Sequence, residues 1–179
     1  MNEAKKEQLI TEGAILLSKK EYEAYKSLIS PCDSFRWWLR SPGNSDKNVM
    51  SVYGVDGSVD NRGCYVDREL GVRPALLIEN LEFTNFGIGD KFIFGEHSFT
   101  IISKYYALCD DVIGKCAFKK DITVPNAVAY KTSDVKKYID DWFENTKAIN
   151  NVLLPIPSES GIFKDNDIVK EINEDEPEI

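Results

Sequence analysis

Histidine is almost absent from this sequence of 179 residues, and its four cysteines are widely spaced. The single histidine is His97, and Cys32, Cys64, Cys109 and Cys116 form no Cys-x-x-Cys pair. A zinc site needs thiolate and imidazole ligands at short, paired spacings, so we expect no metal. A cysteine nucleophile needs a base beside it, and His97 lies in a predicted turn. We therefore expect no catalytic residue and no cofactor.

Long apolar runs are also missing. No stretch reaches the roughly 20 residues that a membrane-spanning helix needs. The N-terminal residues lack the order of a signal peptide, because acidic residues precede the short apolar run and no small-residue cleavage site follows. We expect a cytoplasmic protein of a host bacterium, unless a phage particle or another export route carries it out. Free thiols fit that location, although the spacing of Cys109 and Cys116 would allow a disulfide.

Positive charge is scarce: 22 Lys and Arg stand against 30 Asp and Glu, for a net charge of -8. Nucleic-acid binders need Lys and Arg to displace counterions from phosphates, so we expect no direct nucleic-acid binding. An acidic surface instead suits docking on a basic partner. All five arginines lie between residues 36 and 73. The arginine side chain is a planar fork of donors, so this segment is predicted to use it for fixed polar contacts.

The first half of the chain, residues 14–79, reads as short strands around one helix. Residues 14–17 form a buried strand, and the capping-box spacing of Ser18 and Glu21 predicts a helix that runs from there to Pro31. Three further strands are predicted, the first two of them forming a hairpin around the turn at Asp56-Gly57; they cover residues 49–55, 58–66 and 72–78. Pro74 places the last strand at a sheet edge, or marks a strand end or bulge.

The stretch RWWLRSPG, residues 36–43, holds two of the three tryptophans. It reads as a strand followed by a turn. Successive residues of a strand face opposite ways, so at least one of Trp37 and Trp38 is expected in the core. Arginine and tryptophan also stack on nucleic-acid bases, so ligand contact stays open. The turn after the strand, residues 43–47, is the nearest candidate for function.

The second half, residues 80–160, reads as a hairpin followed by a helix. The hairpin joins residues 90–95 to a long strand over 97–109, with its turn at Gly95-Glu96. Residues 133–146 form the clearest helix of the chain, whose apolar side chains repeat at helical spacing on one face: Val135, Tyr138, Ile139, Trp142 and Phe143. Residues 166–179 are predicted to be an acidic C-terminal tail.

Together these elements predict an α+β fold: short, mostly antiparallel strands, two amphipathic helices and long irregular loops. Residues 1–165 are predicted to be a single compact domain. Its two halves, 14–79 and 80–160, should share one core, because neither alone has the apolar area for stability.

Two groups of acidic residues are candidate sites. The pairs Asp110-Asp111 and Asp140-Asp141 read as solvated carboxylates, in a loop and on the polar face of a helix. Asp56, Gly57, Asp60 and Asn61 are loosely similar to a calcium-binding loop, but the closing glutamate is missing. A hairpin turn explains those four residues better.

Four motifs between residues 14 and 78 together carry a family resemblance: ILLSKKEYEAY, WWLRSPG, VYGVDGSVDNRGCYV and GVRPALLI. They resemble, in order, the C-terminal half of a bacterial domain family of unknown function that is common in gut anaerobes and their phages. Residues 87–145 resemble the family's N-terminal half more loosely, since the arginine of its helix motif is absent. The reversed order implies a circular permutation, or pieces of two repeats completed by domain swapping. The family is similar in style to C-type-lectin-like folds.

Two functions follow, both of a non-enzymatic binding protein. Acidity and small size favour a phage- or mobile-element-encoded inhibitor, anti-CRISPR-like, that binds a basic nucleic-acid enzyme such as a Cas nuclease. The alternative, which the resemblance implies, is a C-type-lectin-like module that binds a ligand or receptor on a cell or phage surface. We expect a monomer or a domain-swapped dimer. The candidate partner-binding residues are Arg36, Arg40, Asn44, Asp46, Lys47, Asp56, Asp60 and Arg62.

Overall fold

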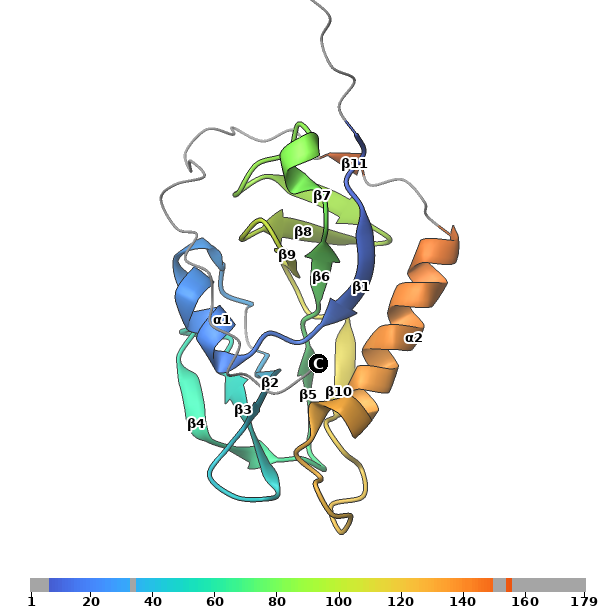
Figure 1. Ribbon diagram of the computed structural model, residues 1–179. Coiled ribbons are helices and arrows are strands. Elements are labelled where there is room, and N and C mark those ends of the chain that lie inside the picture. Colours follow the sequence, from blue (N-terminus) through green and yellow to red (C-terminus); the bar gives the residue numbers. More distant parts are fainter. Residues whose placement is uncertain (1–6, 33–34, 150–153, 156–179) are drawn as a thin grey trace, which may run out of the picture.

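A computed structural model describes residues 7–32, 35–149 and 154–155 of the chain. The predicted tail, 166–179, lies outside these ranges. Figure 1 shows two β-sheets with a helix on either side, so the α+β class is confirmed, with strands as the larger part.

Six strands form the first sheet, and each pairs antiparallel with its neighbours. Their order across the sheet is β1 (Thr11–Ile15), β6 (Ala75–Ile78), β9 (Tyr106–Cys109), β8 (His97–Ile101), β7 (Lys91–Phe94) and β11 (Leu154–Pro155). The second sheet has five strands, and only β5 and β2 pair parallel. Their order is β10 (Gly114–Ala117), β5 (Glu69–Val72), β2 (Trp37–Pro42), β3 (Asn48–Val52) and β4 (Val59–Tyr65).

The helix α1 (Lys19–Tyr25) begins where the capping box predicts. The Ser18 hydroxyl accepts a hydrogen bond from the Glu21 N–H, and the Glu21 carboxylate accepts one from the Ser18 N–H. The α-helix is shorter than predicted, because it gives way at Lys26 to the 3₁₀ turn η1 (Lys26–Leu28).

The second helix, α2 (Asp134–Ile149), begins within one residue of the predicted start, and the Ser133 hydroxyl caps it by accepting from the Lys136 N–H at 3.0 Å. It packs against β1 and β10. Two further 3₁₀ turns are η2 (Leu81–Phe83) and η3 (Tyr130–Thr132). Within the described ranges, no helix has the length and hydropathy of a membrane crossing.

Two predicted strands are wrong in extent. Residues 97–109 are not one strand: the chain reverses after Ile102, where the Ser103 hydroxyl accepts from the backbone N–H groups of Tyr105 and Tyr106, and β8 pairs with β9. Residues 72–78 are likewise divided, because β5 ends at Val72 and β6 begins at Ala75 in the other sheet. Pro74 therefore stands at a strand end, as one of the predicted alternatives has it.

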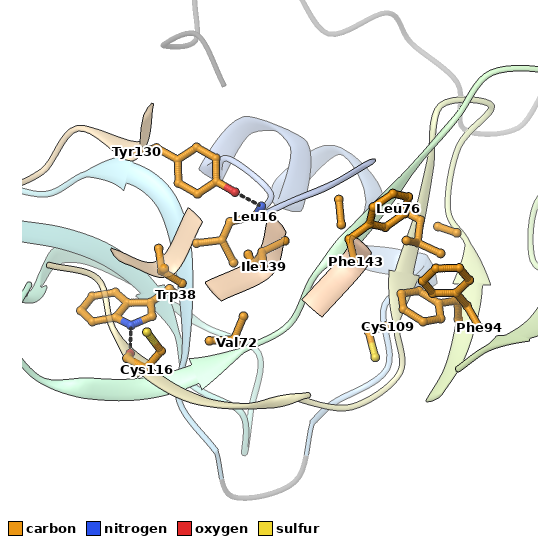
Figure 2. Close-up of a cluster of buried hydrophobic side chains, with 14 of the residues drawn as sticks. Leu16, Trp38, Val72, Leu76, Phe94, Cys109, Cys116, Tyr130, Ile139 and Phe143 are labelled. Atoms are coloured by element: carbon orange, nitrogen blue, oxygen red, sulfur yellow. Dashed lines mark hydrogen bonds between the residues drawn. The ribbon is translucent and has the colours of Figure 1, made fainter. Parts of the chain in front are cut away.

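Two hydrophobic cores lie on opposite sides of β2. Trp38 belongs to the core beneath α2, and Trp37 and Leu39 belong to the core beneath α1. The prediction that the two tryptophans face opposite ways is confirmed, and both are buried. Figure 2 shows the larger core, in which the Trp38 indole donates to the Cys116 carbonyl at 2.9 Å.

Both sheets draw strands from both halves of the chain. The first sheet combines β1 and β6 with β7, β8, β9 and β11, and the second combines β2–β5 with β10. The halves 14–79 and 80–160 thus complete each other's sheets.

Candidate functional site

A partly open hollow lies between α1, the segment after it and the tip of the β3–β4 hairpin. Its space, open mouth included, is about 350 Å³. The hollow is lined by Tyr22, Lys26, Ile29, Ser30, Pro31, Cys32, Trp37, Val52, Tyr53, Gly54, Asp56, Gly57 and Arg73.

The hairpin tip, residues 53–58, is tied to α1 by one buried hydroxyl. Tyr22 donates to the Gly57 carbonyl at 2.6 Å. Gly57 has φ +75°, which favours glycine, and an added Cβ would stand 3.0 Å from the Tyr22 hydroxyl oxygen. Asp56 closes the turn by accepting from the N–H and hydroxyl of Ser58, at 2.9 and 2.7 Å. The wall of the hollow is therefore held in place by local hydrogen bonds.

Arg73 and Trp37 form the base of the hollow. The Arg73 side chain is 2% exposed, and its guanidinium lies 5.1 Å from the centre of a Trp37 ring. Nε donates to the Cys109 carbonyl at 2.6 Å, and Nη2 donates to the carbonyls of Ser30 and Asp110 at 3.0 and 3.4 Å. Burial lowers the pKa of Arg73, although nearby groups oppose that shift.

The rim carries exposed apolar and aromatic surface. Val55 is 76% exposed and Tyr53 is 41% exposed. The Arg36 guanidinium lies over the Tyr53 ring at 4.7 Å, donates to the Ser51 hydroxyl at 2.7 Å and forms an ion pair with Asp60. A rigid aromatic side chain beside an accessible hollow is the kind of feature on which binding energy concentrates.

Cys32 is the one cysteine that lines the hollow, and its thiol has low reactivity. Its thiol is buried and donates to the Asp111 carboxylate at 3.4 Å. Burial raises the pKa of Cys32 to about 11, so little thiolate forms at neutral pH. All four cysteines are buried and free, which confirms the expected free thiols. Within the described ranges, no three His, Cys, Asp or Glu side chains gather as metal ligands would.

The predicted partner-binding residues fall into three places. Asp56 lines the hollow, and Arg36 and Asp60 form the ion pair beside its rim. The other surface candidates lie at the opposite end of β4. There the Asn44 N–H donates to the Arg62 carbonyl at 2.9 Å and the Lys47 ammonium donates to the Ile122 carbonyl; the exposed Asp46 lies on the same loop.

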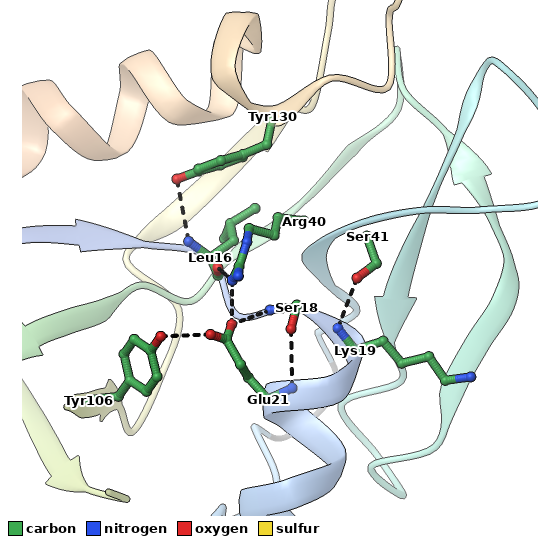
Figure 3. A network of polar contacts seen from close by, with 8 residues as sticks. All are labelled: Leu16, Ser18, Lys19, Glu21, Arg40, Ser41, Tyr106 and Tyr130. Carbon is green, nitrogen blue, oxygen red and sulfur yellow. Dashed lines mark hydrogen bonds and ion pairs between the residues drawn. The ribbon is translucent and has the colours of Figure 1, made fainter. Parts of the chain in front are cut away.

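Arg40 is placed in the interior, away from the surface candidates. It is 4% exposed, forms an ion pair with Glu21 and donates to the Leu16 carbonyl at 2.9 Å. Figure 3 shows this network, in which Tyr106 also donates to Glu21 at 2.7 Å. The role of Arg40 is to join β1, α1 and β2, and a partner on the surface does not meet it directly.

Asp110, one residue of the first acidic pair, makes more hydrogen bonds than a solvated carboxylate is expected to make. Asp110 accepts hydrogen bonds from the Ser98 and Thr100 hydroxyls, both at 2.5 Å, and from Lys91 at 2.8 Å. Asp110 is thus tethered while 23% of its side chain stays exposed, and Asp111 is exposed, as a solvated carboxylate is expected to be. Asp140 and Asp141 lie exposed on α2 with partners one turn away, as a solvated helix face predicts: Lys136 and Lys137.

Most of the hollow has no recognisable signal in the sequence. No motif marks Tyr22 as a binding residue, and Arg73 is one of five clustered arginines. The residues that meet there come from four separated segments, between 22 and 73. Only the hairpin turn at Asp56-Gly57, which is recognisable from its residues alone, marked one wall in advance.

Residues 2–80 match the model of a family described as a domain of unknown function, DUF6273. The match covers the first half of the chain, including the lining residues of the hollow, and ends before residues 87–145. Searches of curated proteins and of solved structures returned no match. The reversed order of the two halves and the C-type-lectin-like likeness stay predictions.

Proposed function

We propose that this chain is a non-enzymatic binding module that holds its ligand or receptor at the hollow and the hairpin tip. The observation that carries the proposal is a preformed hollow with a buried guanidinium at its base and exposed Val55 and Tyr53 at its rim. Binding sites are typically concave, largely apolar and fitted with a few fixed polar groups. Within the range 43–69 of the second sequence-based hypothesis, the hairpin tip at residues 53–58 serves the ligand-binding role in this proposal, because it forms one wall of the hollow.

The test compares binding of the native chain with Val55→Asp on an array of glycans and bacterial envelope proteins. Phe83→Asp is the matched control, because Phe83 is 55% exposed and lies on η2, outside the hollow. We expect hits that disappear with Val55→Asp and persist with Phe83→Asp. The proposal fails if the native chain binds nothing, or if both variants bind as the native chain does.

The inhibitor of a basic nucleic-acid enzyme, such as a Cas nuclease, is the second candidate, and charge favours it. The described residues are nearly balanced, with 18 Lys and Arg against 20 Asp and Glu. Residues 164–179 carry seven acids against two lysines. In this proposal the acidic C-terminal segment supplies the attraction to a basic groove.

Cleavage of DNA by a purified Cas nuclease tests this second proposal. The native chain should slow cleavage at low salt, and raising the salt should relieve the inhibition because exposed charges are screened. Replacing the seven acids by Asn and Gln should abolish the effect, whereas Tyr53→Ala should leave it intact. Unchanged cleavage, or inhibition that survives the neutral segment, contradicts the proposal.

A further inference from the structure

Arg73 is a buried cation without an acidic partner in the described part of the chain. The other two arginines with low exposure are each paired with a carboxylate, Arg36 with Asp60 and Arg40 with Glu21. Arg73 instead donates to three backbone carbonyls. Carbonyl dipoles satisfy hydrogen bonds but leave a full positive charge, and burying an uncompensated charge is costly.

The nearest carboxylates are already engaged elsewhere. Asp110 faces Arg73 with its backbone carbonyl, while its carboxylate accepts from Lys91, Ser98 and Thr100. The Asp111 carboxylate accepts from the Cys32 thiol and from the Val112 N–H at 2.7 Å. Neither carboxylate forms an ion pair with the guanidinium among the described residues.

One nitrogen of the Arg73 guanidinium, Nη1, stays available for a hydrogen bond to a ligand. A guanidinium has five N–H donors, and the three carbonyl contacts use Nε and Nη2. Nη1 has no hydrogen-bond partner among the described residues. Among the described residues, Arg40 Nε is the one side-chain nitrogen or oxygen that is both fully enclosed and without a hydrogen-bond partner. Arg73 Nη1 also has no partner, so it is not fully enclosed and contacts open space. Since Arg73 is 2% exposed and lines the hollow, that space is the hollow.

The residues around Arg73 Nη1 determine which kind of anion the hollow can bind. Trp37 lies against the guanidinium, and Ile29, Pro31 and Val52 supply apolar walls. Lys26 adds positive charge at the lining, whereas the Asp56 carboxylate is occupied by Ser58. The hollow thus combines one deep cation with apolar and aromatic surface.

We propose that the hollow binds a carboxylate carried on a flat apolar body, held by Arg73 Nη1 and packed against Trp37. The inference rests on the proposed binding function and names the chemistry of its ligand. Such a carboxylate has two sources: a small organic acid, or the C-terminal carboxylate of a protein that ends in an aromatic residue. A charge-assisted hydrogen bond to a buried guanidinium provides the selectivity over neutral molecules of the same shape.

Benzoate and benzamide are the probes, because they share a shape and differ in charge. We expect benzoate to shift the indole N–H resonance of Trp37 in a saturable way, with assignment by Trp37→Phe, and benzamide to leave it unchanged. Arg73→Lys keeps the charge but loses the planar fork, and should weaken benzoate binding by about tenfold. A short peptide ending in phenylalanine is then compared with its C-terminal amide; selective binding of the acid peptide assigns the protein source, and its absence assigns the small-acid source.

Other variants keep the inference testable if Arg73→Lys does not fold. Lys26→Met changes an exposed lining residue and should weaken benzoate binding by about threefold through lost attraction. Asp33→Asn removes a carboxylate outside the described ranges; if only this variant binds benzoate, the chain supplies its own counter-charge and the proposal is wrong. Equal shifts with benzoate and benzamide, preferential binding of inorganic phosphate, or benzoate binding indifferent to Arg73→Lys in a folded variant would also overturn it.

The same measurements separate this inference from the proposed function. If Val55→Asp abolishes array binding while benzoate has no effect on Trp37, the hairpin site stands and the carboxylate ligand is wrong. If benzoate binds as expected while array binding is indifferent to Val55→Asp, the hollow is a small-acid site and the receptor-binding role is wrong.

Discussion

At the scale of single residues, Glu21 and Arg40 are charged members of the sequence motifs whose side chains are buried in the interior. Both side chains are about 5% exposed or less. Glu21 accepts from the Ser18 N–H, from Tyr106 and from Arg40, while Arg40 Nε stays enclosed without a partner. Removing one member of a buried ion pair leaves the other charge without compensation.

Glu21→Ala should therefore lower the free energy of unfolding by about 3–5 kcal/mol. Urea denaturation measures the loss. Glu23→Ala is the matched control on the same helix, because Glu23 is exposed and its ion pair with Lys19, at 3.8 Å, is a surface one. That control should cost under about 0.5 kcal/mol. Equal losses in the two variants would show that the buried pair adds nothing beyond helix propensity.

The same carboxylate should make stability depend on pH. Burial alone would raise the pKa of Glu21, but the hydrogen bond and charge of Arg40, the Ser18 N–H and the Tyr106 hydroxyl together bring it below the ordinary 4.5. Its contribution is thus complete above the unfolded-state pKa and is lost as pH falls through the lower folded-state value. The stability difference between the native chain and Glu21→Gln should shrink on acidification below about pH 4.5. Urea titrations at several pH values measure it, and a constant difference would contradict the assignment.

At the scale of elements, the strand and turn of RWWLRSPG are shaped by close backbone contact. Gly43 donates its N–H to the Asn48 carbonyl at 2.6 Å, and a Cβ on Gly43 would clash with the Arg62 carbonyl oxygen of β4. Gly63, on the same strand, has φ +90° and lies close to the backbone of Val49. Gly43 thus allows the β2–β3 loop to pack on β4, and Gly63 allows close pairing of β4 with β3.

Gly43→Ala should lower the free energy of unfolding by about 1–3 kcal/mol, because the obstacle is backbone and cannot rotate away. Gly13→Ala in β1 is the control, since its added Cβ would meet only the Leu77 side chain, at an ordinary 3.7 Å. Thermal and urea unfolding of both variants measure the difference. A Gly43→Ala variant as stable as the Gly13→Ala variant would show that the loop relaxes freely.

The sequence predicted those elements whose signals are local. The capping box at Ser18 placed the start of α1, and glycine-containing turns placed both hairpins. The reversal between β8 and β9 was missed because Ser103 makes it with a side-chain hydroxyl, without the glycine or proline that marks most turns. The strand β10 was missed because GKCA has no apolar alternation and owes its place to pairing with β5.

The hollow could not be predicted, because its geometry depends on contacts distant in sequence. Arg73 reaches the carbonyls of Ser30 and Cys109, 43 and 36 residues away along the chain. No local pattern records such pairings. What the composition did indicate, that the clustered arginines make fixed polar contacts, is confirmed by Arg36, Arg40 and Arg73.

At the scale of the whole molecule, the two halves are interleaved. The pairing of β6 with β9 joins them in the first sheet, and that of β5 with β10 joins them in the second. Figure 1 shows α2, from the second half, alongside β1 from the first. We expect a chain with this arrangement to fold as one cooperative unit, because each sheet contains strands from both halves.

A rearranged chain tests whether the halves pair within one molecule. It runs from Phe86 to Ile179 and continues from Met1 to Asn85. Its new termini lie in the loop after η2, where Asn85 is exposed. Residues 156–179 and 1–6 form a linker of 30 residues, which can span about 100 Å when extended and so exceeds the width of a domain this size. We expect a monomer by light scattering, with a urea midpoint close to that of the native chain. The circular permutation that the resemblance implies predicts this result, because the rearranged chain has the unpermuted order of halves and every strand keeps its neighbours. A stable dimer for both the native and the rearranged chain would support completion by domain swapping instead.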